Sequence, residues 1–301
     1  MTSVEVINAG LCRTGTMSTR KALVDMGFGE CYHMQECFAR SDTPIWMKCF
    51  EKDCFDPVIK LMSEANFKSG CDLPFCAIFE ELLISYPKAK VVLTVRDDPQ
   101  KWVDSWRRTV YKINTLPMYT EILRLSPPPL RYMAPSINNQ FHDLFWTPII
   151  KKGNSVSIQK VPEDVHTWDM TDEQMCQLYL NWTEYVKQKV PADQLIIFNV
   201  NEGIGPLSEF LGVDQSFGTP MPFLNDRNEF DQLTRMVKLG SSVQIIGYTG
   251  LALSISRRSR GSSVKYSKLI QLPFWLCIIT PIAAAFVAQQ TIGTDKLVSF
   301  L

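Results

Sequence analysis

Acidic residues are missing from a long stretch near the C-terminus. Between Asp231 and Asp295 no Asp or Glu occurs, whereas seven basic residues do: Arg235, Lys238, Arg257, Arg258, Arg260, Lys265 and Lys268. The whole chain of 301 residues has 31 basic and 31 acidic side chains, so residues 1–231 carry a net charge of about −7. Zero overall charge with an acidic body excludes a general nucleic-acid binder, because such proteins neutralise phosphates with an excess of cations.

Patterns that build metal centres, disulfide frameworks and secretory signals are missing too. The nine cysteines contain no C-x-x-C pair, and the three histidines are not clustered. We therefore expect reduced, buried thiols and no metal site. The first residues lack a basic segment followed by a long apolar run, so we expect no secretory signal peptide and a body that folds in the cytosol. With 46% hydrophobic residues, the chain has ample material for a core.

Residues 269–288 form a run of 20 residues without a charged side chain. As a helix this run is about 30 Å long, which matches the hydrocarbon core of a bilayer. Because it follows the basic segment, we predict a single C-terminal transmembrane helix with the body on the cytosolic side; a buried core helix is the alternative. Residues 241–256 are also uncharged. They form either an interfacial helix or, as the second choice, another span that places the body on the lumenal side.

This charge and hydropathy pattern divides the chain into four parts. We predict one α/β domain over residues 1–231 and a basic linker over 232–268. The transmembrane helix then spans residues 269–288, and residues 289–301 form a short tail. The membrane is thus a predicted partner, whereas the oligomeric state is left open.

Within the body, β-rich runs alternate with helical segments. The β-rich runs are residues 4–9, 90–95 and 195–200. Helices are expected over residues 18–26, after residue 99, and over 171–189. Strands that alternate with helices predict a parallel α/β sheet covered by helices. Residues 107–168, with three consecutive prolines and few periodic positions, predict a helical and looping insertion or lid.

The first strand leads into a loop with the spacing of a phosphate-binding loop. Gly10 and Gly15 stand between the strand and the helix, where backbone N–H groups and a helix N-terminus can meet an anion. A nucleoside-triphosphatase loop has Lys and then Ser or Thr after the second glycine, but Thr16 and Met17 stand here. A cation, Arg13, lies two residues before Gly15. Taken alone, the spacing also fits a tight turn with a solvated arginine.

Two motifs together indicate a family. The run GLCRTGTMS at residues 10–18 resembles the 5′-phosphosulfate loop of P-loop-fold sulfotransferases, which use 3′-phosphoadenosine 5′-phosphosulfate (PAPS). A strand that ends in Arg96, with Ser105 in the next helix, resembles their 3′-phosphate motif. One branch of this family is also similar at CYHM (31–34), DLP (72–74), EFLGV (209–213) and PFLN (222–225). The resemblance covers residues 4–230 and implies a P-loop-like three-layer fold with a central parallel sheet.

The resemblance also implies a reaction and a donor site. The expected reaction moves a sulfuryl group from PAPS to a hydroxyl or amine of a small molecule, without a metal. The phosphosulfate loop would consist of Arg13, Thr14, Gly15, Thr16, Met17 and Ser18, where Met17 replaces the usual Thr. Arg13 would stabilise charge on the leaving oxygen, and Arg96 with Ser105 would hold the 3′-phosphate. The aromatic and Met residues of 107–168 suggest an apolar acceptor.

Asp72 is the predicted general base, because the segment DLP stands where cytosolic relatives carry a His-Leu-Pro motif. An unshifted Asp has a pKa of ~3.9, so burial that raises its pKa would help this role. His33 is the alternative base or an acceptor-pocket residue. The late Arg-Lys-Gly segment of the relatives is not apparent, and residues 222–225 are the suggested replacement.

Two other functional classes stay open at this point. A membrane-tethered, non-catalytic protein with the P-loop fold is favoured by Met17 but disfavoured by the presence of Arg13, Asp72, Arg96 and Ser105. A nucleotide kinase or nucleoside triphosphatase is disfavoured by the missing lysine.

Overall fold

The computed structural model describes residues 4–114, 139–213, 220–222 and 235. Its centre is a five-stranded sheet with the strand order β2-β3-β1-β4-β5. The strands are β1 (Val6–Asn8), β2 (Cys31–Tyr32), β3 (Ser69–Gly70), β4 (Lys90–Val95) and β5 (Leu195–Asn199). All four pairings are parallel. The predicted parallel α/β sheet is therefore confirmed, and β2 and β3 are additions to the three predicted strands.

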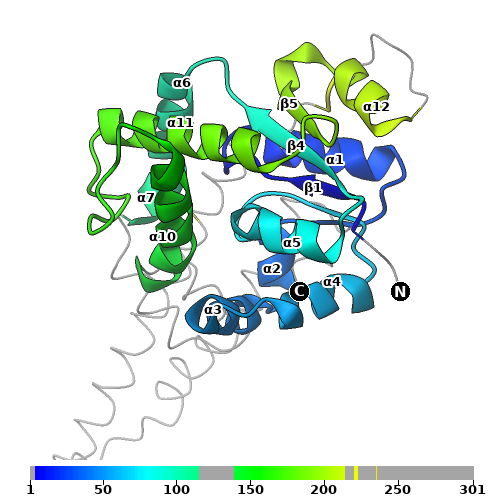
Figure 1. Ribbon diagram of the computed structural model, residues 1–301, viewed down its shortest axis with the longest axis horizontal. Helices are drawn as coiled ribbons and strands as arrows, with labels where there is room; N and C mark the ends of the chain where they lie inside the picture. The colour runs from blue at the N-terminus through cyan, green and yellow to red at the C-terminus, as the bar shows by residue number, and fades with distance from the viewer. Residues whose placement is uncertain (1–3, 115–138, 214–219, 223–234, 236–301) are drawn as a thin grey trace, which may run out of the picture.

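Alternate residues of the central strands face two separate hydrophobic clusters. Ile7, Val91 and Leu93 belong to one cluster, whereas Val6 and Val92 belong to the other. Because successive side chains of a strand point to opposite faces, the sheet is buried on both sides. Figure 1 shows the resulting three layers, with the sheet between two sets of helices.

Helices pack on both faces of the sheet. One face is covered by α1 (Thr16–Asp25) and α12 (Gly205–Leu211). The other is covered by the short 3₁₀ helix η1 and by helices that include α5, α6, α10 and α11. Their bounds are η1 (Phe75–Ile78), α5 (Phe79–Ser85), α6 (Pro99–Arg108), α10 (Asn139–Val156) and α11 (Asp172–Lys189). The helix predicted over 171–189 is α11, and a Thr171 capping box starts it.

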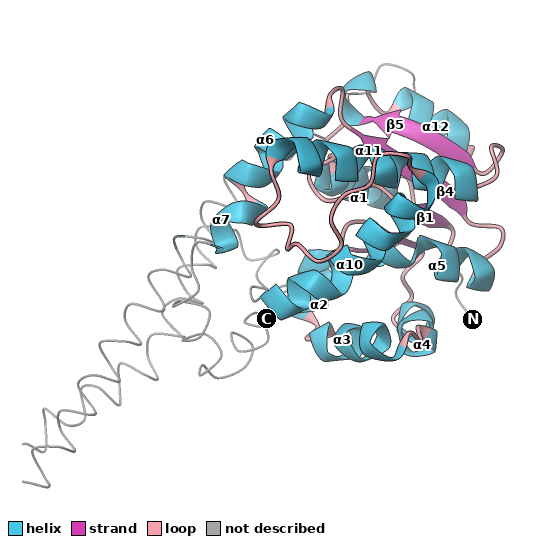
Figure 2. Cartoon of the chain, turned by 60° about the vertical axis from the view of Figure 1, so that its left-hand side comes forward, coloured by secondary structure: helices cyan, strands magenta, loops and turns pink. Residues whose placement is uncertain are grey.

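Five further helical elements complete the described part of the chain. They are α2 (Met34–Ala39), α3 (Thr43–Lys52), α4 (Asp56–Glu64), α7 (Val110–Asn114) and the 3₁₀ turn η2 (Val200–Glu202). Figure 2 shows α3 and α4 next to each other and away from the sheet. The predicted insertion at 107–168 contains α7 and α10, and its residues 115–138 lie outside the described residues.

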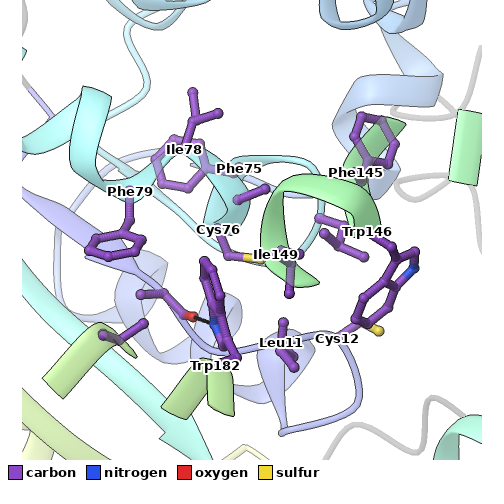
Figure 3. Packing of buried hydrophobic residues seen from close by; sticks show 14 of the residues in the cluster. Leu11, Cys12, Phe75, Cys76, Ile78, Phe79, Phe145, Trp146, Ile149 and Trp182 are labelled. Carbon is purple, nitrogen blue, oxygen red and sulfur yellow. Dashed lines mark hydrogen bonds between the residues drawn. The ribbon is translucent and has the colours of Figure 1, made fainter. Parts of the chain in front are cut away.

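Buried tryptophans attach the helices to the loop that follows β1. Trp182 of α11 donates its Nε1–H to the carbonyl of Ala9 at 2.8 Å, and Trp102 of α6 donates to the carbonyl of Cys12 at 2.8 Å. Both side chains are fully buried. Figure 3 shows Trp182 among the buried residues of the core, which include Leu11 and Cys12 of the loop. The core therefore also determines the path of the loop.

Several predictions fall on residues that the structure does not describe. The linker at 232–268, apart from Arg235, lies outside the described residues, and so do the transmembrane segment at 269–288 and the tail at 289–301. Within the described part of the chain, no helix has the length and apolar character needed to cross a membrane. The eight described cysteines are free thiols, and six of them are buried.

Candidate active site

The predicted site residues meet at one edge of the sheet. The glycine loop follows β1, His33 follows β2, Asp72 lies two residues after β3, and Arg96 follows β4. Because the strands are parallel, their carboxyl ends share an edge, and this edge is where open α/β sheets bind ligands. Four segments that are distant in sequence thus contribute to one region.

The two glycines of the loop are needed for different reasons. A Cβ at Gly10 would lie 1.9 Å from Thr94 Oγ1 and 2.7 and 2.8 Å from the backbone O and N of Thr94. Gly10 therefore allows the loop to pass against β4. Gly15 has a φ of 96°, a left-handed conformation that favours glycine, and it precedes the first residue of α1. The loop can turn into the helix only because both positions lack a side chain.

The loop presents the N-terminus of α1 to the sheet edge. The first-turn amides of Thr16, Met17 and Ser18 have no carbonyl partner within the helix, and the helix dipole favours an anion there. No acidic side chain occupies this turn. The side chains of Thr16 and Met17 are buried, with exposed fractions of 4% and 7%.

Thr14 faces inward instead. Its hydroxyl donates to the carbonyl of Leu11 at 2.6 Å and lies 2.6 Å from Thr94 Oγ1. Its amide donates to the same Leu11 carbonyl at 3.3 Å. Both polar groups of Thr14 are therefore used to close the loop.

Arg13, Arg96 and Ser105 lie together, as the sequence predicts. Arg13 Nε donates to Ser105 Oγ at 3.2 Å, and Arg96 Nε donates to the carbonyl of Arg13 at 2.8 Å. The backbone N–H of Arg96 donates to the hydroxyl of Tyr179 on α11 at 2.8 Å. Arg13 has a φ of 70°, so its unusual backbone conformation is supported by the Arg96 side chain. Two guanidinium groups and one hydroxyl therefore share a small region beside the α1 N-terminus.

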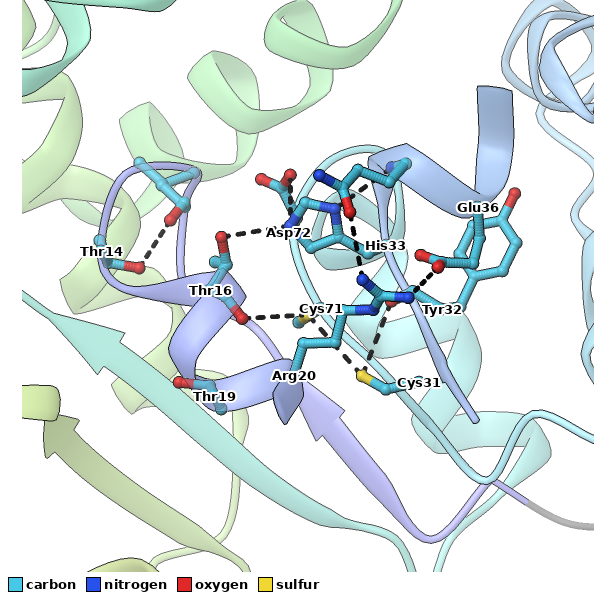
Figure 4. Close-up of polar contacts among 12 residues, drawn as sticks. Thr14, Thr16, Thr19, Arg20, Cys31, Tyr32, His33, Glu36, Cys71 and Asp72 are labelled. Atoms are coloured by element: carbon cyan, nitrogen blue, oxygen red, sulfur yellow. Dashed lines mark hydrogen bonds and ion pairs between the residues drawn. The ribbon is translucent and has the colours of Figure 1, made fainter. Parts of the chain in front are cut away.

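His33 and Asp72 form a buried pair near the first residue of α1 (Figure 4). His33 Nε2 lies 3.1 Å from Asp72 Oδ2 and 3.5 Å from Thr16 Oγ1. The amide of Gln35 donates to His33 Nδ1 at 3.2 Å, so Nδ1 carries a lone pair. In the neutral ring the proton is then on Nε2, which donates to the Asp72 carboxylate. The backbone of Asp72 has a φ of 67°, so this carboxylate follows a tight turn after β3.

Comparison with known proteins identifies the family of the chain. The family model described as "Sulfotransferase domain" matches residues 5–230. The chain belongs to this sulfotransferase family. A relative from Aspergillus versicolor, named Ava biosynthesis cluster protein M, is 27% identical over 216 residues, which cover 69% of this chain and 76% of that protein.

Burial and nearby charges determine the protonation of His33 in this site. Burial, followed by the charges of Arg20 and Arg13, lowers the pKa of His33 to about 3. His33 is therefore neutral at physiological pH, with one ring nitrogen occupied by the Gln35 amide and the other donating to Asp72. In this arrangement Asp72 is the hydrogen-bond acceptor of the pair. No cluster of three or more His, Cys, Asp or Glu side chains in the described segments could hold a metal ion.

A cavity of about 560 Å³ lies between α3, η1, α5 and α10 of the sulfotransferase. Its walls are mostly apolar, and the residues concerned are Phe50, Phe55, Ala77, Ile78, Leu144 and Pro148. Its polar lining residues are Asp53, Glu81, Thr147, Lys151 and Lys152. The predicted site residues do not line it, but η1, which forms one wall, starts three residues after Asp72.

Some residues of the site have roles that the sequence did not predict. Tyr179 contacts the Arg96 backbone, Asn8 accepts hydrogen bonds from the Gly10 amide and the Thr94 hydroxyl, and Gln35 contacts His33. In the sequence, Asn8 is a polar residue inside an apolar strand, and Tyr179 and Gln35 are single polar residues on helices. Such positions are too common in proteins to indicate a functional site. The late segment EFLGV ends α12, and Gly212, with a φ of 74°, terminates that helix. Of the segment 222–225, only Pro222 is described.

Proposed function

We propose that this protein transfers the sulfuryl group of PAPS to a hydroxyl or amine of an apolar small molecule. The observation that carries the proposal is the cluster of Arg13, Arg96 and Ser105 beside the N-terminus of α1. Such a site suits a ligand with two separate anionic groups, which is what distinguishes PAPS from a simple phosphate ester. The proposal extends the sulfotransferase family assignment to a named donor.

The residues present fit the two ends of the donor. The amides of the α1 first turn, with the hydroxyls of Thr16 and Ser18, would hold the 5′-phosphate. Arg96 and Ser105 would hold the 3′-phosphate. Two guanidinium groups in one region repel each other, and a bound anion relieves this repulsion. The donor supplies the activated sulfuryl group, and Arg13 would stabilise the negative charge left behind when the bond to sulfur breaks.

Asp72 would act as the general base. The acceptor hydroxyl or amine must lose a proton as it attacks. The Asp72 carboxylate, which accepts a hydrogen bond from neutral His33, would take this proton. His33 donates its Nε2–H to Oδ2 and so orients the carboxylate. We therefore assign the base to Asp72 and an orienting role to His33.

The cavity beside η1 supports the proposal of an apolar acceptor. Its volume of about 560 Å³ suits a small molecule, and Phe50, Phe55 and Leu144 line it with apolar surface. One wall belongs to α10, within the segment that the sequence suggested for acceptor binding.

We also propose that residues 269–288 anchor the protein to a membrane and that the body faces the cytosol. The segment Asn181-Trp182-Thr183 is a glycosylation sequon, which a lumenal body would expose to glycan transfer during synthesis. Asn181 is only 2% exposed, and its side chain donates to the Gln159 carbonyl at 2.9 Å and accepts from Gln177 at 2.6 Å. A glycan there is incompatible with this packing, which supports a cytosolic body.

Removal of residues 269–301 is expected to shift the protein from the membrane fraction to the supernatant after cell lysis; retention in membranes would contradict the anchor.

The function is tested by incubating the full-length protein with ³⁵S-labelled PAPS and a panel of apolar phenols, alcohols and amines. We expect a labelled organic product. Asp72→Asn should lower kcat about 100- to 10,000-fold while donor affinity changes little, because the carboxamide cannot take the proton. Asp97→Asn is the matched control, since Asp97 is exposed and contacts Lys101 and Asn199 instead of the site. Absence of both donor binding and transfer refutes the proposal, whereas binding without transfer across the panel favours a non-catalytic binding protein.

A further inference from the structure

Arg20 is a partly buried cation that neither the donor site nor the base assignment uses. It lies on α1, one helical turn after Thr16, and its side chain is 23% exposed. Its Nη1 donates to Gln35 Oε1 at 3.1 Å, and its Nη2 forms an ion pair with Glu36 Oε1. Both partners belong to the first turn of α2. One guanidinium group therefore connects α1 to α2 through two neighbouring side chains (Figure 4).

The first turn of α2 is also what holds the His33 ring. The Gln35 amide donates to His33 Nδ1 at 3.2 Å, and the Cys37 amide donates to the His33 carbonyl at 3.1 Å. Helix α2 has only six residues, so its own hydrogen bonds supply little rigidity. The position of the Gln35 amide, and with it the ring nitrogen that carries the proton, depends on contacts to the rest of the protein.

We infer that Arg20 is a positioning residue for the His33–Asp72 pair: by holding Gln35 and Glu36, it keeps the α2 amide on Nδ1 of His33 and the Nε2–H on Asp72. The inference rests on the proposed function only where it names Asp72 as the base. The juxtaposition itself is independent of that assignment.

The charges around the pair are consistent with this role. Arg20 is, after burial, the largest cause of the lowered pKa of His33, so its charge also favours the neutral ring. Burial raises the pKa of Glu36 to about 7, and Arg20 opposes this shift whereas Glu30 adds to it. Glu36 Oε2 is buried and has no hydrogen-bond partner in the described part of the chain. Glu36 therefore depends on Arg20 for its compensation, and loss of Arg20 affects both neighbours of the ring.

A plain stabilising contact between α1 and α2 is the competing explanation, and Arg40 provides the matched control. Arg40 lies just after α2 and its Nε contacts the buried carboxylate of Asp42 at 3.1 Å. Like Arg20, it pairs with a buried carboxylate next to α2, but it has no side-chain contact with Gln35 or His33 in the described structure. If Arg20 acts only through stability, Arg20→Met and Arg40→Met should alter the site in the same way.

The first test follows the His33 ring by NMR in full-length protein with ¹⁵N-labelled histidine, in a non-ionic detergent and without donor or acceptor. The chain has three histidines, and His33→Gln identifies the signals of His33. In wild type we expect a neutral ring with the proton on Nε2 from pH 5 to 9. In Arg20→Met we expect a mixture of tautomers and a titration midpoint that moves toward neutral pH, and in Arg40→Met the wild-type pattern. Unchanged His33 signals in Arg20→Met overturn the inference.

The second test is kinetic. Arg20→Met should lower kcat about 10- to 100-fold with the KM for PAPS within about twofold, because the base is misplaced while the donor site is intact. Arg20→Lys keeps the charge but cannot bind both side chains, so it should restore only part of kcat. Should Arg20→Met fail to fold, Gln35→Ala removes one Arg20 contact and is expected to shift the His33 signals in the same direction; no shift there overturns the inference. If wild type transfers no sulfuryl group, the proposed function fails, and the NMR result still decides the positioning role.

Discussion

Removal of the Arg96 side chain should weaken donor binding through two effects at once. Arg96→Met keeps a similar length but removes the charge and the Nε–H that the carbonyl of Arg13 accepts at 2.8 Å. The backbone N–H of Arg96, which donates to Tyr179, is unaffected by this substitution. The variant therefore tests the guanidinium group without detaching the end of β4 from α11.

The magnitude follows from the contacts. A hydrogen bond from a charged group contributes about 1.5–3 kcal/mol, and Arg96 provides one to the loop and a further one to the proposed 3′-phosphate. Part of the first contact is lost to solvent, because Arg96 is only partly buried. We expect donor binding to weaken by about 2–3 kcal/mol, which is roughly a 30- to 150-fold increase in Kd. Arg96→Lys should fall between wild type and Arg96→Met, because an ammonium group restores charge without the planar donor pair.

The assay is isothermal titration of full-length protein with 3′-phosphoadenosine 5′-phosphate, the desulfated donor. Arg108→Met is the matched control: Arg108 lies on α6 near Ser105, its side chain is 59% exposed, and it forms an ion pair of 3.9 Å with Asp104 of the same helix. Its Kd should stay within about twofold of wild type, since exposed ion pairs contribute little. A folded Arg96→Met protein whose Kd is within threefold of wild type would refute both the 3′-phosphate assignment and the role of Arg96 in supporting the loop.

Two further predictions concern stability. Gly10→Ala places a Cβ against the backbone of Thr94 and should lower the free energy of unfolding in urea by about 3 kcal/mol. Gly27→Ala is the control: Gly27 has a φ of 89° and nothing within 4 Å of the added Cβ, so the loss should be only about 1 kcal/mol. Equal losses in the two variants would contradict the close packing of the loop. Folding lowers the pKa of His33 from 6.5 to about 3. Between these two pH values His33 is protonated in the unfolded state but neutral in the folded state, so the free energy of unfolding decreases as the pH falls. Between pH 7.5 and 5 wild type should therefore lose about 1–2 kcal/mol more than His33→Gln, and parallel pH profiles would show that His33 is not held neutral.

Local patterns predicted the parts of the fold that depend on local physics. The strand at 90–95 is an apolar run long enough to recognise, and it is β4. The loop from Gly10 to Gly15 is a short contiguous motif, and the structure places it between β1 and α1 as expected. In contrast, β2 and β3 have two residues each, too few for any periodicity. They exist as strands because β2 pairs with β3 and β3 pairs with β1, which is a property of the assembled sheet.

The sequence by itself determined the family, the loop, and the candidates Arg13, Asp72, Arg96 and Ser105, because these residues stand in recognisable local motifs. Only the tertiary structure shows how these candidates lie relative to one another. His33 and Asp72 belong to different motifs, and their relation depends on two neighbouring strands that end at the same edge of the sheet. The tautomer of His33 depends in turn on the amide of Gln35, and the place of Gln35 depends on Arg20 from another helix. Proton positions are set by contacts across the fold, and such contacts leave no pattern along the chain.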